Sequence, residues 1–109
     1  MPNRYKLVVN VPFTHAHIVR QALGQAGAGK VGNYTFCSFS VKGVGRFLPG
    51  NNARPYIGAC GIHEETEEEQ IQVEVSGDDM KSVLAALKKA HPYEEPGYEI
   101  YQMIDESIF

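Results

Sequence analysis

The feature that most constrains the fold is a strand followed directly by a helix, a pattern that the sequence repeats. Residues 5–11 are apolar and rich in valine, and apolar residues recur at helical spacing over 14–26, with Thr14 as the predicted N-cap. Residues 71–75 alternate apolar and polar side chains, and an amphipathic helix is predicted over 77–90. Because the strand-to-helix spacing is the same in both, each pair is predicted to form half of one sheet-and-helix unit.

Each half is completed by one more strand. Period-two alternation predicts strands over 34–40 and 98–102. Between the halves, 41–47 is a candidate hairpin partner, 48–55 is a loop, and 56–62 is a short strand candidate. This order predicts an α+β fold of the ferredoxin-like βαββαβ type. In that fold an antiparallel sheet carries two helices on one face, and here an elaborated loop or hairpin lies between the halves.

The other face of the predicted sheet carries aromatic side chains. Phe39 and Tyr101 are expected there, together with Tyr34 or Phe36. Sheets with one uncovered apolar face often bury it against other subunits. The sequence therefore predicts a homo-oligomer.

A glycine pattern over 27–32 matches G-x-G-x-x-G, the signature of dinucleotide-binding loops. In those loops the glycines follow a strand and open a helix, so that the helix N-terminus faces the phosphates. Here they follow a predicted helix and precede a predicted strand. The order favours a helix end and a turn over a phosphate site.

Length and composition indicate one soluble domain over residues 1–109. Hydrophobic residues make up 43% of the chain, which excludes a disordered segment. No apolar run approaches the ~18 residues of a transmembrane helix, and the N-terminus has no signal-peptide pattern. Two cysteines are too few for a disulfide framework, so a cytoplasmic location without membrane contact is expected.

Charge is divided unevenly along the chain. Residues 1–63 hold seven Lys and Arg and no acid, whereas 64–109 hold all 13 acids and three Lys, for a net charge of −3. Two interpretations are open: the halves interleave in one fold, or the basic half of one copy faces the acidic half of another. The bases are widely spaced, so nucleic acid is not an expected partner.

One metal-binding pattern is present, although it is short. Cys60 and His63 form a C-x-x-H pair, and thiolate and imidazole are donors that zinc accepts. The complete set of candidate donors is Cys37, Cys60, His63, His91, Glu94 and Glu95. The alternative is a small packed cysteine beside a surface histidine. A divalent metal is thus a candidate cofactor whose identity the sequence leaves open.

Other charged segments have structural explanations. The acidic run 64–69 is interpreted as a solvated turn and strand edge. Segment 41–58 carries Lys42, Arg46 and Arg54 with no acid, so it is either a partner-contact loop or a loop that binds a small anion. No nucleophile elbow or Walker loop occurs, and no catalytic residue is assigned.

Three segments together resemble the inserted domain of the larger members of the Nif-three-like family. They are G-x-G-x-x-G-N-Y-x-x-C-S-F over 27–39, P-Y-I-G over 55–58, and A-A-L-K-K-A-H-P-Y-E-E-P-x-Y-x-I-Y over 85–101. The most specific part of the resemblance comprises His91, Pro92, Tyr93, Glu94, Glu95, Pro96 and Tyr98. That inserted domain is similar to CutA divalent-cation-tolerance proteins and to PII signal proteins.

The resemblance implies a CutA-like domain that self-associates, commonly as a trimer. Complete Nif-three-like proteins resemble metal-dependent hydrolases whose paired metals lie in flanking halves. This chain is expected to be a stand-alone version without those halves, so their metal ligands have no counterpart here. The predicted function is a small binding or regulatory module with a metal or small-anion site between subunits. The alternatives are a metal-dependent hydrolase-related activity in the Glu94–Glu95 region, or a docking module for a separate metal-binding partner; a non-enzymatic role is favoured.

Overall fold

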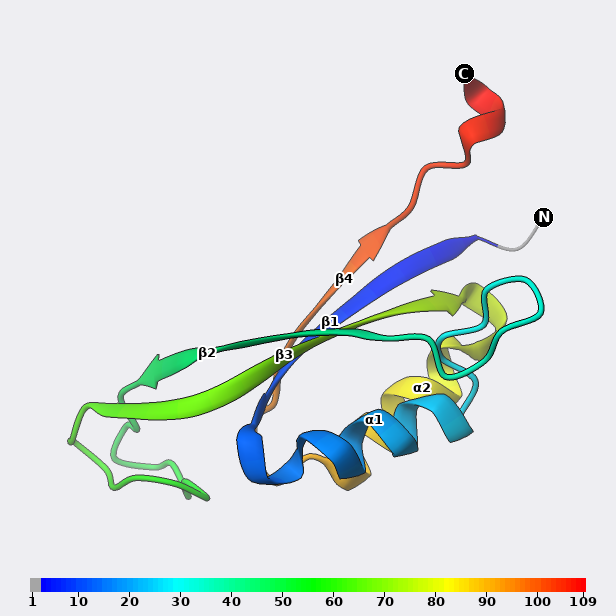
Figure 1. The fold of residues 1–109 in the computed structure, drawn as a ribbon. Helices are drawn as coiled ribbons and strands as arrows, with labels where there is room; N and C mark the ends of the chain where they lie inside the picture. The colour runs from blue at the N-terminus through cyan, green and yellow to red at the C-terminus, as the bar shows by residue number, and fades with distance from the viewer. Residues whose placement is uncertain (1–2) are drawn as a thin grey trace.

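Two layers make up the fold: a four-stranded sheet and a pair of helices on one of its faces (Figure 1). The computed structural model describes residues 3–109. The elements are β1 (Arg4–Pro12), η1 (Phe13–His15), α1 (Ala16–Gln25), β2 (Phe39–Phe47), β3 (Glu64–Ser76), α2 (Gly77–Ala90), β4 (Gly97–Gln102) and η2 (Glu106–Ile108). The strands pair in the order β2-β3-β1-β4, and each neighbouring pair is antiparallel. The predicted ferredoxin-like fold is confirmed.

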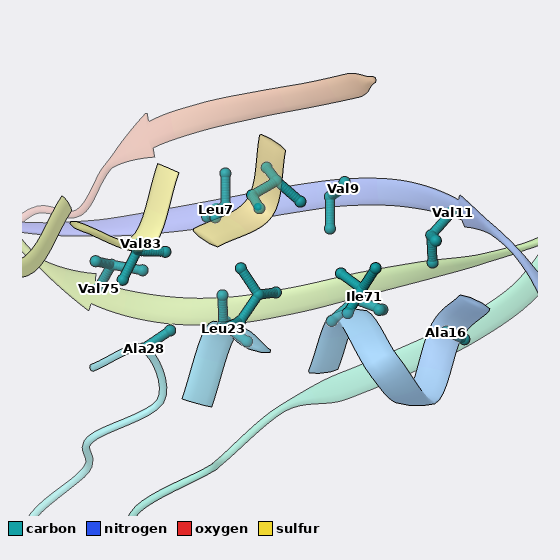
Figure 2. Packing of buried hydrophobic residues seen from close by; sticks show 12 residues of the cluster. Leu7, Val9, Val11, Ala16, Leu23, Ala28, Ile71, Val75 and Val83 are labelled. Carbon is teal, nitrogen blue, oxygen red and sulfur yellow. The ribbon is translucent and has the colours of Figure 1, made fainter. Parts of the chain in front are cut away.

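The hydrophobic core lies between the sheet and the helices. Alternate residues of the two central strands face the helices and are buried: Leu7, Val9, Val11, Ile71, Val73 and Val75. Figure 2 shows Leu23 of α1 and Val83 of α2 packed against these strands. Burial of each such side chain contributes about 1.5–3 kcal/mol to folding, which holds the helices on this face.

The helix boundaries follow local capping chemistry. The side chain of Ser76 accepts a hydrogen bond from the Asp78 amide at 3.4 Å, and Lys88 and Lys89 lie in the last turn of α2, where the helix dipole favours cations. Thr14 does not cap α1, and that prediction was wrong. Its Oγ1 instead lies 2.9 Å from His15 Nδ1, within η1, and α1 begins two residues later. No helix within residues 3–109 is long and apolar enough to cross a membrane.

The face of the sheet away from the helices, here called the open face, is covered by no helix of residues 3–109 (Figure 1). Phe39 pairs with Gln72 and Val41 with Gln70, and these side chains all point to the open face. Tyr101 lies there too, opposite Lys6. The placement of Phe39 and Tyr101 is confirmed.

β2 and β3 form a ribbon that extends past the helices, so the molecule measures 49 × 26 × 23 Å (Figure 1). β3 pairs with β1 only as far as Glu68, but its pairing with β2 continues to Glu64. The acidic run 64–69 is therefore strand throughout. The predicted turn was wrong, and only residues 64–67 have one unpaired edge.

Three expected elements between the halves differ from the structure. Residues 34–38 form an irregular loop, so the strand predicted over 34–40 begins only at Phe39. Segment 41–47 continues that strand without a turn and is not a separate hairpin partner. Residues 56–62 form no strand, because Gly58 and Gly61 have φ angles of 94° and 79°, which interrupt an extended backbone.

The loop over 34–38 is held by packing on a helix. The Phe36 ring lies directly over Gly24 of α1, where a Cβ atom would come within 2.1 Å of it. Phe36 itself has a φ of 58°, an unfavourable angle for an aromatic residue. The aromatic alternation that predicted a strand thus reflects one side chain that packs against α1. Neither Tyr34 nor Phe36 reaches the open face of the sheet, so that prediction was wrong.

The glycines over 27–32 end α1 and turn the chain. Gly27, Gly29 and Gly32 have φ angles of 113°, 81° and 56°, and the helix ends at Gln25. The prediction of a helix end and a turn is confirmed.

The two oppositely charged halves of the chain interleave. Four ion pairs each join a base from residues 1–63 to an acid from 64–109: Arg4–Glu74, Arg20–Glu69, Lys30–Asp79 and Arg46–Glu65. The first of these lies across the β1–β3 pair. The two halves thus interleave within one copy, as the first of the two interpretations predicted.

Candidate functional site

A cleft of about 520 Å³ opens on the open face, at the end of the sheet where β2 and β3 extend furthest. The β2–β3 ribbon forms one wall, and loop residues 48–57 form the second. The turn that connects α2 to β4, residues 91–96, supplies the third wall. The cleft is thus built from segments that are far apart in the sequence.

His91 anchors the connecting turn to the sheet. Its side chain is 5% exposed, and Nε2 lies 2.7 Å from the backbone oxygen of Asn10 in β1. The Tyr93 amide donates to Nδ1 at 3.1 Å. A carbonyl oxygen only accepts and an amide only donates, so these partners specify a neutral ring with its proton on Nε2. Burial lowers the pKa of His91, which favours the same neutral form.

Tyr93 connects the turn to β3 across the end of β1. Its hydroxyl donates to Glu68 Oε2 at 2.8 Å. The Tyr93 ring lies 6.0 Å from the Phe47 ring and 6.4 Å from the Tyr56 ring, measured between centroids. Burial, and then the hydrogen bond to Glu68, raise the pKa of Tyr93, so the phenol stays protonated and remains a donor.

Glu94 ties the loop to the same turn. Its Oε1 accepts the backbone N–H of Arg54 at 2.7 Å. The loop is braced a second time by Cys60, whose thiol donates to the Ala53 carbonyl at 3.3 Å. Three residues of the H-P-Y-E run thus reach different elements: His91 contacts β1, Tyr93 contacts β3 and Glu94 contacts the loop. The run shapes the cleft.

The sequence and fold of this chain resemble those of known proteins. No family model matches the chain. It is 49% identical over 102 residues to the GTP cyclohydrolase 1 type 2 homolog of Halalkalibacterium halodurans, across 94% of this chain and 27% of that protein. The solved structure of a Bacillus cereus protein related to NIF3 superposes with a TM-score of 0.83 at 40% identity, over 95% of this chain and 26% of the other. The chain is thus similar to one segment of Nif-three-like proteins.

The chain spans about a quarter of the length of the curated relatives that it matches. Its fold is also that of CutA proteins. The PII-like protein CutA from a Nostoc species superposes with a TM-score of 0.66 at 15% identity, over 96% of this chain and 85% of the other. The fold and the relatives together support a small binding or regulatory module.

The candidate metal donors do not all lie together in the structure. Cys37 lies in the loop after α1, while Cys60 and His63 lie in the loop at the opposite end of the molecule (Figure 1). His91 uses both ring nitrogens in hydrogen bonds, so no lone pair is free for a metal. No three His, Cys, Asp or Glu side chains within residues 3–109 are grouped so that they could hold an ion. Metal binding by these residues stays a prediction.

The basic residues assigned to a partner loop have separate positions. Lys42 and Arg46 lie on strand β2, so the loop placement was wrong for both, and only Arg54 lies in a loop. Lys42 Nζ lies 5.1 Å from the centroid of the Phe13 ring on the helix side of the sheet. Arg46 binds Glu65 at 3.5 Å and also lines the cleft.

Sequence reasoning missed Glu68 and Gly45. Glu68 was counted within the acidic run, and nothing in its neighbours distinguishes it from the other glutamates of that run. Gly45 lies within β2 and makes room for Glu68. The H-P-Y-E-E-P run was the one sequence motif that pointed to the cleft, because its residues form one wall.

Proposed function

We propose that this Nif-three-like domain is a self-associating module whose cleft binds a small ligand. The proposal rests on the cleft itself, a concave site of about 520 Å³ that is held in shape by hydrogen bonds from His91, Tyr93 and Glu94. Small-molecule sites typically measure about 300–1,000 Å³ and combine apolar walls with a few fixed polar groups. Phe47 and Tyr56 supply apolar walls here, and Glu68 and Tyr93 supply polar groups.

Self-association is supported by the open face of the sheet. Phe39 is 66% exposed, Val41 46% and Tyr101 52%, although all three lie on a sheet rather than on a loop. A second copy of the chain would remove these side chains from water. The cleft opens on the same face, so association would also place it beside the neighbouring copy.

The oligomeric state tests the self-association. We expect native mass spectrometry of the untagged chain to show a defined oligomer, and Val41→Asp to convert it to monomer. Val44→Asp is the matched control, since Val44 is 50% exposed on the same strand but points to the other face. A monomeric parent protein, or equal effects of the two substitutions, would refute association through the open face.

The same measurement, repeated with chelator, tests the predicted metal. Extra mass that chelator removes would support a resident divalent ion, and His63→Ala would then be expected to abolish it. An unchanged mass would contradict the predicted metal. The proposed small-ligand site in the cleft would then be a site for an organic ligand.

A further inference from the structure

The carboxylate of Glu68 occupies a position that β2 is built to accommodate. A Cβ atom on Gly45 would lie 2.0 Å from Glu68 Oε1, so any larger residue there would displace the carboxylate. Gly43 lies two residues earlier on the same face of the same strand, and a Cβ atom there would meet nothing within 4 Å. An alanine at position 45 would thus displace the carboxylate at the end of the flexible Glu68 side chain, whereas an alanine at position 43 would not.

Glu68 has no cationic partner among residues 3–109. Its recorded hydrogen bond comes from the neutral Tyr93 hydroxyl, and it belongs to none of the four ion pairs. Arg46 is the one base that lines the cleft, and its guanidinium is held by Glu65, whose side chain points to the opposite face. A half-buried carboxylate without a counter-charge is unfavourable in isolation.

The remaining charge in the cleft has the same sign. Glu94 and Glu95 line it together with Glu68, so three carboxylates face one guanidinium that is already paired. An anion such as phosphate would be repelled there. A divalent metal is also disfavoured, because no suitable group of three donors exists within the described chain.

Aromatic rings line the same cleft as the carboxylate, and the hydroxyl of one of them, Tyr93, contacts it. Tyr93 packs at 6.0 Å from Phe47 and at 6.4 Å from Tyr56, between ring centroids, and Tyr56 is 53% exposed. Ring faces attract ammonium groups through the aromatic quadrupole, and they also bury the apolar body of a ligand. A carboxylate beside exposed aromatic surface is therefore suited to an amphipathic cation.

We infer that the cleft binds an organic cation, an ammonium group on an aromatic or apolar body. The ammonium pairs with Glu68, and the body packs against Tyr56 and Phe47. This inference rests on the proposed function, because it takes the cleft as the ligand site and adds the chemical class of the ligand.

Three matched probes test the ligand class: phenethylamine, which is cationic at neutral pH, the neutral 2-phenylethanol and the anionic phenylacetate. Chemical-shift mapping by NMR on the full chain would give both the affinity and the site. We expect only phenethylamine to shift the amides of residues 45–47, 68 and 93. Glu68→Gln should weaken its binding about tenfold, the effect of losing one charge-assisted hydrogen bond. Added salt should weaken it further.

Matched variants distinguish the loss of the Glu68 carboxylate from a general disturbance of the fold. Gly45→Ala should weaken phenethylamine binding as Glu68→Gln does, because it displaces the carboxylate, whereas Gly43→Ala should leave binding unchanged. Glu99→Gln, on the open face outside the cleft, should also have no effect. If Gly45→Ala does not fold, the isosteric Glu68→Gln decides the question.

The outcomes distinguish the two levels of the proposal. If 2-phenylethanol or phenylacetate binds in the cleft as tightly as phenethylamine, or if Glu68→Gln binds phenethylamine normally, the cationic class is refuted and the cleft stands. If none of the three probes shifts the cleft residues, the ligand site of the proposed function fails as well.

Discussion

The backbone at Gly29 leaves no space for a side chain, while the backbone at Gly32 in the same turn does. Both have positive φ angles, 81° and 56°. A Cβ atom on Gly29 would lie 2.4 Å from the carbonyl oxygen of Cys37, whereas a Cβ atom on Gly32 would meet nothing within 4 Å. The close approach is fixed by hydrogen bonds, since the Gly29 amide donates to Glu74 and its carbonyl accepts from Cys37.

Alanine substitutions at these two glycines should therefore differ in cost. We expect Gly32→Ala to reduce the free energy of unfolding by about 1–2 kcal/mol, the cost of a left-handed conformation alone. Gly29→Ala should cost about 3 kcal/mol or more, because a backbone clash adds to that conformational cost. Urea denaturation of both variants measures this difference. Equal losses would show that the loop after α1 shifts freely to relieve the clash.

The buried His91 should make stability depend on pH. Its pKa is lowered in the folded state, chiefly by burial, so between that value and about 6.5 the unfolded chain binds more protons than the folded one. Stability should therefore be complete above about pH 6.5 and decline as the pH falls below it. The urea midpoint of the parent chain should fall as the pH is lowered through this range. The part of this fall that is due to His91 should be absent in His91→Gln. His17→Gln, at an exposed position on α1, should retain the pH dependence of the parent chain. Identical pH dependence in the parent chain and in His91→Gln would show that His91 is not its cause.

At the scale of elements, Arg20 links α1 to the sheet. It pairs with Glu69 of β3 and lies 3.5 Å from Ser40 of β2, with only 28% of the Arg20 side chain and 13% of the Glu69 side chain exposed. Arg46 and Glu65 form a pair within the ribbon, 3.5 Å apart, and their side chains are 67% and 69% exposed. The two pairs contain the same residue types in different surroundings.

Arg20→Ala should destabilise the fold more than Arg46→Ala. Loss of Arg20 leaves a largely buried carboxylate unpaired, which costs about 2 kcal/mol. Loss of Arg46 breaks a solvated pair, which costs at most about 1 kcal/mol. Thermal or urea unfolding of both variants gives the comparison, and Arg20→Met with Glu69→Leu should recover part of the loss. If Arg46→Ala were the more damaging, the ribbon rather than the α1 contact would control stability.

The elements that were predicted correctly are those in which the period of apolar residues in the sequence matches the period of buried residues in the structure. Residues 71–75 and 77–90 alternate or recur because one side of each faces the core, so pattern and structure agree. The strand predicted over 34–40 failed because Phe36 packs on Gly24, a contact that no local pattern encodes. The cleft was predictable only in part for the same reason. Its H-P-Y-E-E-P wall is one continuous motif, whereas Asn10, Glu68 and Gly45 join it through strand pairing.

At the scale of the whole molecule, charge and apolar surface are distributed differently. Four bases of residues 1–63 pair with acids of residues 64–109 within one copy. Apolar side chains instead remain exposed on the open face and in the C-terminal segment, residues 103–109. That segment leads away from the two layers, as Figure 1 shows. Self-association should therefore depend on apolar contacts more than on ion pairs.

The C-terminal segment gives the whole-molecule prediction. Ile108 and Phe109 are 69% and 95% exposed, and the last backbone hydrogen bond from the segment to the sheet is from the Met103 amide to Arg4 at 2.9 Å. Ile108→Ser combined with Phe109→Ser should therefore change the unfolding free energy at low protein concentration by no more than about 0.5 kcal/mol. Leu23→Ala, a wholly buried contrast, should cost about 2–5 kcal/mol at any concentration.

Protein concentration then separates folding from association. If the segment packs on a second copy, the urea midpoint of the parent chain rises with concentration by mass action, and the double serine variant shows a smaller rise. The measurement is a pair of urea titrations for each protein, at low and at high concentration. A loss of stability in the serine variant that is the same at both concentrations would mean that these side chains pack within their own copy, and the role of the segment in association would be refuted.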